Sequence, residues 1–96
     1  MSENREKPAN LDLTAIELND LLGFFTGILS EKAWQHMGFR LIPGKSELEK
    51  DMIKAKLAID CTAFLAEKMI PSLSIDDARM LRAMITDIQL NYVKQV

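Results

Sequence analysis

The hydrophobic pattern of the chain predicts three helices, over about 15–37, 47–70 and 75–94. Within each segment, apolar residues recur every three or four positions, as they do along one side of an α-helix. No segment shows a sustained alternation of apolar and polar residues rich in β-branched types, so we expect no strands. The pattern predicts an all-α fold, with residues 1–10 as a flexible polar tail and residues 11–96 as a single helical domain.

The first predicted helix changes its apolar side near Ser30. Before Ser30, one broad face carries most of the apolar residues, whereas charged and polar residues occupy that same face afterwards. Ala33, Trp34 and Met37 then point roughly the other way. A single small core cannot cover both sides, so we expect the later half to pack on the rest of the chain. The earlier half is expected to contact a second subunit or another partner.

Two glycines lie within that earlier half, at Gly23 and Gly27. A glycine inside a helix costs about 1 kcal/mol relative to alanine, which calls for some compensation. Close approach of another helix would supply it, and so would a local bend near Ser30. The predicted interface therefore comprises Leu18, Leu21, Leu22, Gly23, Phe24, Phe25, Gly27, Ile28 and Leu29.

The second predicted helix is apolar around most of its circumference. One stripe includes Met52, Ala55 and Ile59, and a second follows Ile53, Leu57, Phe64 and Leu65. Such a helix is normally buried between neighbours, so we expect it to be the central element. The third helix is apolar on one face only. Because the connection over 71–73 is short, the second and third helices should form an antiparallel hairpin.

Capping signals mark the predicted helix ends. A Ser or Thr followed three residues later by an acidic residue is typical of a helix start, and the chain has this pattern at Thr14/Glu17, Ser46/Glu49 and Ser74/Asp77. Gly38 can adopt the left-handed conformation that ends a helix, and Pro71 lacks the backbone N–H that the second helix would need to continue.

Charge and cysteine content narrow the function classes. With 12 Lys and Arg against 14 Asp and Glu, the net charge of −2 provides no overall cationic field for nucleic acids or anionic membranes. The only cysteine, Cys61, cannot form an intramolecular disulfide, and no secretion signal or apolar run of membrane-spanning length is visible. We expect a cytoplasmic protein that does not enter membranes. A chain of 96 residues also has a modest core, which oligomerisation would reinforce.

No residue pattern predicts a catalytic, cofactor or metal site. His36 is the only histidine and is expected in the last turn of a helix, while Cys61 is expected to be a buried packing thiol. The acidic groups near Glu47 and Asp76 fall at predicted helix starts, where the helix dipole favours them without any catalytic role. The run from Pro43 to Ser46 lacks the upstream strand and glycine of a phosphate-binding loop.

Several short segments together resemble a known family. From Ala33 to Val93 the chain is similar to small bacterial proteins of the domain-of-unknown-function family numbered 1844. The segments that carry the resemblance are Ala33-x-x-His36-x-Gly38, Asp51-Met52-x-x-Ala55-Lys56-x-Ala58-Ile59-Asp60, Leu65-x-x-Lys68, Leu73-Ser74, Leu81 and Leu90-Asn91-Tyr92-Val93. The chain departs from the family pattern at Trp34 and at Pro71-Ser72. The resemblance implies a short all-helical cytoplasmic protein with no assigned activity.

These observations favour a non-enzymatic helical protein that self-associates, with a dimer favoured, and serves as an adaptor or accessory subunit; an unidentified protein partner is a further option. The alternative is a small nucleic-acid or ribosome-associated factor that uses Arg79 and Arg82. Acids intersperse these cations and no aromatic residues interleave with them, so nucleic-acid binding is the weaker hypothesis. An enzyme would need a site built from Cys61, His36 or a carboxylate across a subunit interface.

Overall fold

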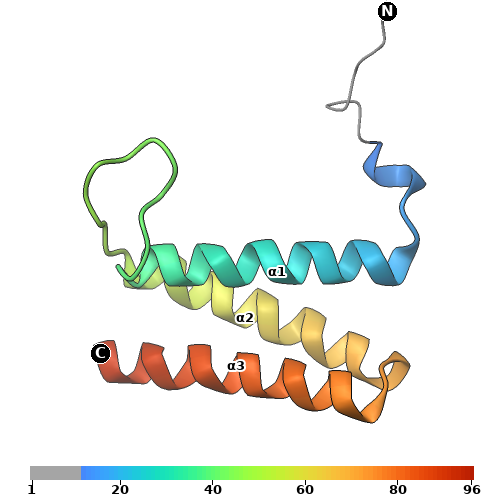
Figure 1. The fold of residues 1–96 in the computed structure, drawn as a ribbon. Coiled ribbons are helices and arrows are strands. Elements are labelled where there is room, and N and C mark those ends of the chain that lie inside the picture. Colours follow the sequence, from blue (N-terminus) through green and yellow to red (C-terminus); the bar gives the residue numbers. More distant parts are fainter. Residues whose placement is uncertain (1–11) are drawn as a thin grey trace, which may run out of the picture.

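The computed structural model of the protein, which describes residues 12–96, has three α-helices in that range (Figure 1). They are α1 (Leu18–His36), α2 (Met52–Met69) and α3 (Ile75–Gln95), with short 3-10 helices at Leu13–Ala15 and Ile70–Ser72. In Figure 1, α2 lies between α1 and α3, and it packs against both, whereas α1 and α3 touch much less. The predicted all-α fold, the α2–α3 contact and the central place of α2 are confirmed.

The start of α1 differs from the prediction. Thr14 lies in the 3-10 helix, where its hydroxyl and backbone N–H both donate to the carboxylate of Asp12, at 2.6 and 3.0 Å. Those hydrogen bonds lower the pKa of Asp12, the hydroxyl having the larger effect. Glu17 is itself the N-cap, because its carboxylate accepts hydrogen bonds from the backbone N–H groups of Asn19 and Asp20. The predicted Thr14/Glu17 capping pair is therefore wrong.

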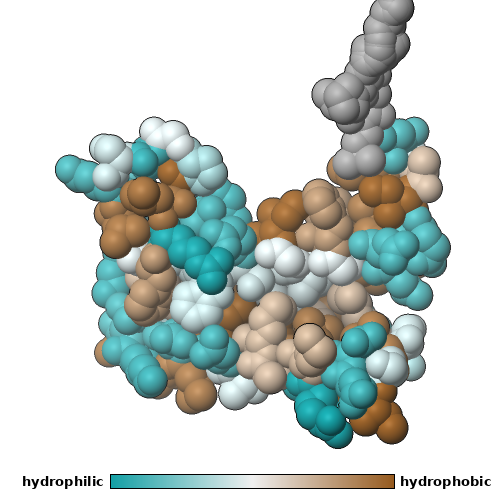
Figure 2. All heavy atoms as spheres, in the orientation of Figure 1, coloured by the Kyte–Doolittle hydropathy of each residue, from teal (hydrophilic) through white to brown (hydrophobic). Residues whose placement is uncertain are grey.

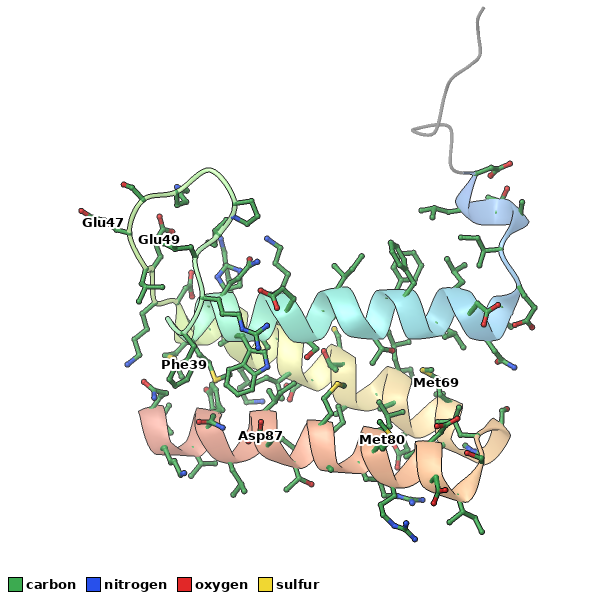
Figure 3. The ribbon with its side chains drawn as sticks, viewed as in Figure 1. Phe39, Glu47, Glu49, Met69, Met80 and Asp87 are labelled. Atoms are coloured by element: carbon green, nitrogen blue, oxygen red, sulfur yellow. The ribbon has the colours of Figure 1, made fainter. Side chains whose placement is uncertain are left out.

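The start of α2 also differs, because Asp51 rather than Ser46 caps it. The Asp51 carboxylate accepts from the backbone N–H of Lys54 at 3.1 Å, while its own N–H donates to the carbonyl of His36 at 2.8 Å. That second bond ties the beginning of α2 to the end of α1. Glu47 and Glu49 consequently lie in the loop before α2 (Figure 3), where Glu49 pairs with Lys45 at 3.2 Å.

The other helix ends agree with the sequence signals. Gly38 follows α1 with a φ of 87°, a left-handed conformation that glycine adopts without strain. Pro71 lies in the 3-10 helix directly after α2, and the hydroxyl of Ser74 accepts from the backbone N–H of Asp77 at 3.1 Å to cap α3. Asp76 and Asp77 thus occupy the first turn of α3, where the helix dipole favours acids.

Small side chains dominate the contact between α1 and α2. Thr26, Ser30 and Ala33 are buried on α1, and Ala55, Ala58, Thr62 and Ala66 are buried on α2. The hydroxyls of Thr26 and Thr62 donate to carbonyls one turn back in their own helices, at 2.7 and 2.6 Å. These two hydroxyls therefore have hydrogen-bond acceptors within their own helices, and the Thr26 hydroxyl also lies 3.4 Å from the sulfur of Met69 on α2.

The largest apolar cluster lies where all three helices meet. It contains Met37, Ile59 and Ile88 with three buried alanines, and Trp34 and Met84 are among the partly buried residues packed against it. The later half of α1 therefore packs on the rest of the chain, as predicted. All four phenylalanines in the sequence, in contrast, are exposed.

The two glycines of α1 have different surroundings. A Cβ on Gly23 would lie 3.7 Å from the methyl group of Met69, an ordinary contact, whereas a Cβ on Gly27 would meet nothing within 4 Å. α1 also runs as one helix through Ser30 (Figure 1). Within residues 12–96, therefore, no neighbouring helix requires a glycine at position 27.

Overpacking the α1–α2 contact should destabilise the fold. Ala55 is fully buried there, so Ala55→Leu is expected to lower the free energy of unfolding by about 1–3 kcal/mol. Ala83→Leu, at an exposed position of α3, is the control and should change it by less than about 0.5 kcal/mol. Urea denaturation followed by circular dichroism measures both values. Equal effects would contradict the close contact.

Gly27→Ala should stabilise the protein by about 0.5–1 kcal/mol, because it removes the entropic cost of glycine at an open helical position. Gly38→Ala should instead destabilise it by about 1 kcal/mol, since alanine is strained at positive φ. Thermal and denaturant unfolding provide the comparison. A loss of stability in Gly27→Ala would mean that another helix packs closely on Gly27.

Candidate interaction surface

One side of the α1–α2 pair carries a continuous row of apolar residues. We call this row the α1–α2 strip; it consists of Leu29, Leu57, Cys61, Phe64 and Leu65, and of Phe25, which lies one helical turn before Leu29 on α1. Two adjoining depressions run along it, one lined by Leu57, Ala58 and Cys61 and the other by Cys61, Phe64 and Leu65, with Leu29 in both. The strip forms because spacings of three and four residues place these side chains on one face of each helix.

The exposure of apolar residues along α2 overturns two expectations. Ile53 is 85% exposed, Leu57 65% and Phe64 58%, so the second apolar stripe of α2 is not buried between neighbours. Cys61 is exposed as well, and is not the buried packing thiol that the sequence suggested. The physical reason is that α1 and α3 cover only the side of α2 that carries Ile59 and the small residues Ala55, Ala58, Thr62 and Ala66.

None of the nine predicted interface residues of α1 is buried. The exposed ones are Leu18, Phe24, Phe25, Gly27 and Ile28, and the half-buried ones are Leu21, Leu22, Gly23 and Leu29. Figure 2 shows hydrophobic residues at the surface along the upper edge of α1 and on the loop that follows it. In the same stretch, the buried positions are Thr26 and Ser30. The apolar side of early α1 thus faces outward. Sequence analysis missed the α2 residues Leu57, Cys61 and Phe64 as neighbours of this surface.

A second apolar depression lies between α2 and α3. Met69, Leu73, Met80 and Met84 line it together with Leu81 and Asp77. Figure 3 shows Met69 on α2 and Met80 on α3. An adjoining depression reaches α1 at Asp20 and Gly23. Methionine side chains adapt to irregular surfaces, so this region is a further apolar area that the chain itself leaves open.

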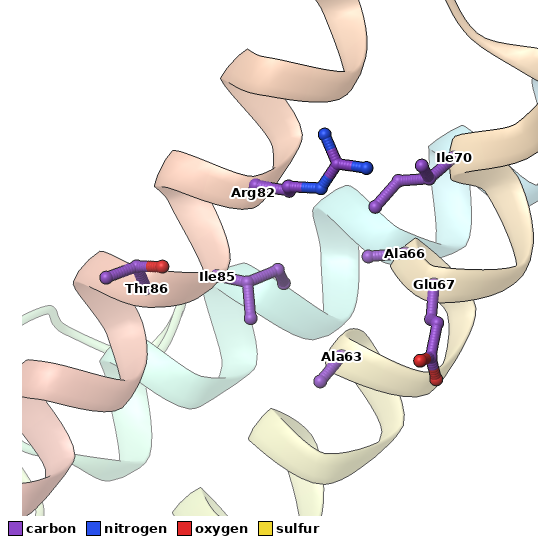
Figure 4. Close-up of a pocket in the computed structure, with 7 residues that line it drawn as sticks. All are labelled: Ala63, Ala66, Glu67, Ile70, Arg82, Ile85 and Thr86. Atoms are coloured by element: carbon purple, nitrogen blue, oxygen red, sulfur yellow. The ribbon is translucent and has the colours of Figure 1, made fainter.

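A third depression, on the α2–α3 contact, contains the α3 cation considered for nucleic-acid binding. Figure 4 shows Arg82 and Ile85 of α3 and Ala63, Ala66 and Glu67 of α2 among the residues that line it. One cation and one anion give this lining no net charge. Arg79, three residues earlier on the same face of α3, pairs with Asp76 at 3.3 Å. Each arginine therefore has an acid nearby.

His36 and Cys61 line the same depression of the α1–α2 strip, together with Lys32 and Lys54. No hydrogen bond joins the imidazole to the thiol, and Leu57 and Ala58 belong to the same lining. Nor do residues 12–96 contain any group of three or more His, Cys, Asp or Glu side chains placed to hold a metal ion. The arrangement offers contact with apolar groups and has no assembled nucleophile and base.

Charged residues border the strip without interrupting it. Lys56 donates to Asp60 at 2.8 Å, and this hydrogen bond and the Asp60 charge raise the pKa of Lys56. At the other end, the ammonium of Lys68 lies 5.3 Å from the centre of the Phe64 ring, a cation–π distance. Aliphatic stems of this kind cover apolar surface while their charged ends stay in water.

Beyond α1, the aromatic residues form a separate small group. Trp34 packs edge-on against Phe39 with ring centres 5.5 Å apart, and the guanidinium of Arg40 lies 5.6 Å from the Trp34 ring. Arg40 also pairs with Glu31. These contacts hold the start of the loop against the end of α1. Trp34 is therefore a structural residue.

No helix within residues 12–96 is both long enough and apolar enough to cross a lipid bilayer.

Comparisons with known proteins give one match. No curated protein and no solved structure matches the chain. The family model described as "Domain of unknown function (DUF1844)" matches residues 20–94, a span that includes all of α2, nearly all of α1 and α3 and the whole α1–α2 strip. Since this match covers most of the sequence, the chain belongs to the DUF1844 family.

Proposed function

We propose that the protein is a non-enzymatic helical module that forms a homodimer in the cytoplasm and acts as an adaptor or accessory subunit through protein–protein contacts. The observation that carries this proposal is the distribution of apolar side chains. Alanines make up most of the buried apolar residues, whereas all four phenylalanines and several leucines and isoleucines are exposed. Exposed apolar surface of this extent is characteristic of interaction sites.

The energetics of a small chain support association. Each buried alanine removes little apolar surface from water, and burial is worth about 25 cal/mol per Å2 of apolar area. Because alanines make up most of this core, much of the apolar surface of the chain remains in contact with water and does not contribute to stability. Covering the exposed aromatic and aliphatic residues with another polypeptide would recover part of it.

The distribution of charges supports this proposal over a nucleic-acid role. Arg79 pairs with Asp76, and Arg82 shares its depression with Glu67. Nucleic-acid affinity rises with the number of phosphates that cations neutralise, and arginines next to acids contribute little to that.

Light scattering coupled to gel filtration tests self-association directly. At tens of micromolar, we expect the mass of a dimer of the 96-residue chain. A monomer throughout this range would contradict the proposal.

Phe25→Asp should shift the protein to the monomer, because it places a charge on a half-exposed apolar face. Lys56→Asp, at an exposed position of α2 beside the strip, should disrupt assembly or folding less than Phe25→Asp. The two variants are compared by mass and by helical content. Equal effects on both measurements would refute the role of the early α1 face.

A further inference from the structure

The α1–α2 strip is large enough to form a stable interface. With the neighbouring Ile28 and Ile53 included, its large exposed side chains present about 600 Å2, at roughly 200 Å2 per fully exposed residue. A stable dimer buries roughly 800 Å2 per partner, of which somewhat more than half is apolar. Together with Ile28 and Ile53, the strip therefore supplies the apolar part of a standard interface.

Cys61 lies at the middle of the strip. Together with Leu29, it lines both depressions, the one toward Leu57 and the one toward Phe64. Leu57 precedes Cys61 by one helical turn, and Phe64 follows it by nearly one turn. The apolar surface thus extends in both directions from the thiol.

Charged side chains lie at both ends of the strip and beside Cys61. Lys32 and Lys54 lie at the end nearest His36, and Lys68 lies over Phe64 at the other end. Asp60, the acid that lines the strip, is already paired with Lys56. A partner that covers the strip therefore contacts mainly apolar groups, while the ammonium groups at its two ends can stay in water.

We infer that this partner is a second copy of the chain, packed face to face about a two-fold axis that passes beside Cys61. In an isologous contact, the same surface of each copy faces that of the other. When the two strips overlap fully, the midpoint of one strip, at Cys61, lies against the midpoint of the other. If one strip were displaced along the other, Leu57 or Phe64 of both copies would remain exposed to water. The α1 and α2 helices of the two copies then form a four-helix arrangement. This inference rests on the proposed self-association and adds the surface and the symmetry.

Thiol cross-linking tests the position of the axis. Because the chain has a single cysteine, a short bismaleimide can join two copies only through the two Cys61 thiols. In the dimer, the two thiols have a high effective concentration, so covalent dimer should form at least about tenfold faster than between freely diffusing chains. The control is the double variant Cys61→Ala, Thr86→Cys, which moves the thiol to an exposed position of α3. It should cross-link only at the diffusional rate.

The outcomes separate this inference from the proposed function. A dimer by light scattering with rapid cross-linking at Cys61 and slow cross-linking at position 86 supports both. A dimer in which Cys61 cross-links no faster than the control overturns the two-fold arrangement and leaves self-association standing. A monomer at tens of micromolar overturns both.

Two matched leucine variants test the surface independently. Leu57 on the strip is 65% exposed and Leu90 on α3 is 54% exposed, so replacing either by Asp opens no large cavity. We expect Leu57→Asp to weaken dimerisation at least about tenfold, and Leu90→Asp to leave the dissociation constant unchanged within about twofold. Sedimentation equilibrium measures the constants and circular dichroism checks that helicity is retained. A larger loss in Leu90→Asp would place the interface on α3 and overturn the inference, as would equal losses. If Leu57→Asp does not fold, the cross-linking result decides.

Discussion

The close contact between α1 and α2 determines most of the structure. The residues buried on these two helices are alanine, serine and threonine apart from Gln35 and Ile59, and the hydroxyls of Thr26 and Thr62 donate to carbonyls within their own helices. A contact of this kind lets two helices approach closely, but it buries little apolar area. The bond from the Asp51 N–H to the His36 carbonyl fixes the direction in which α2 leaves the loop and holds this contact in register. α3 then adds Ile88 and Ala78 on one further side of α2.

The outward position of the large apolar residues follows from that contact. An α-helix contacts a given neighbour with one of its faces. Because small residues occupy the contacting faces of α1 and α2, the large apolar residues of these helices lie on their other faces. On α1 these are Phe24, Phe25 and Ile28, and on α2 they are Ile53, Leu57 and Phe64. Residues from both helices line the two depressions of the α1–α2 strip. The apolar residues of α1 and those of α2 therefore form one surface. The shared lining by Leu29 and Cys61 makes that surface continuous.

The sequence predicts the secondary structure well and the burial only in part. Ser74, Gly38 and Pro71 mark helix ends because their effects are local, whereas Ser46 and Asp51 both suit the start of α2 and a long-range bond to His36 decides between them. The change of side in α1 correctly places Trp34 and Met37 against the rest of the chain. For α2, hydrophobicity alone does not reveal which of its two stripes is covered. That depends on how much chain remains to cover it, and α3 covers one side, which leaves Leu57 and Cys61 exposed.

Folding and association should be coupled in a protein built this way. A domain near 100 residues has a modest margin of stability, and here alanine contributes most of the buried apolar side chains. Binding that occurs only in the folded state adds to that margin in proportion to the logarithm of the partner concentration. If the α1–α2 strip is the interface, the residues that hold the dimer together are distinct from those that hold α1 to α2. A substitution at Leu57 would then change mainly the dissociation constant of the dimer, and one at Ala55 mainly the free energy of unfolding. Because folding and dimerisation are linked, each substitution would also change the other quantity to a smaller extent. The separation of the two residue sets along the same helix is therefore what allows assembly and folding to be altered one at a time.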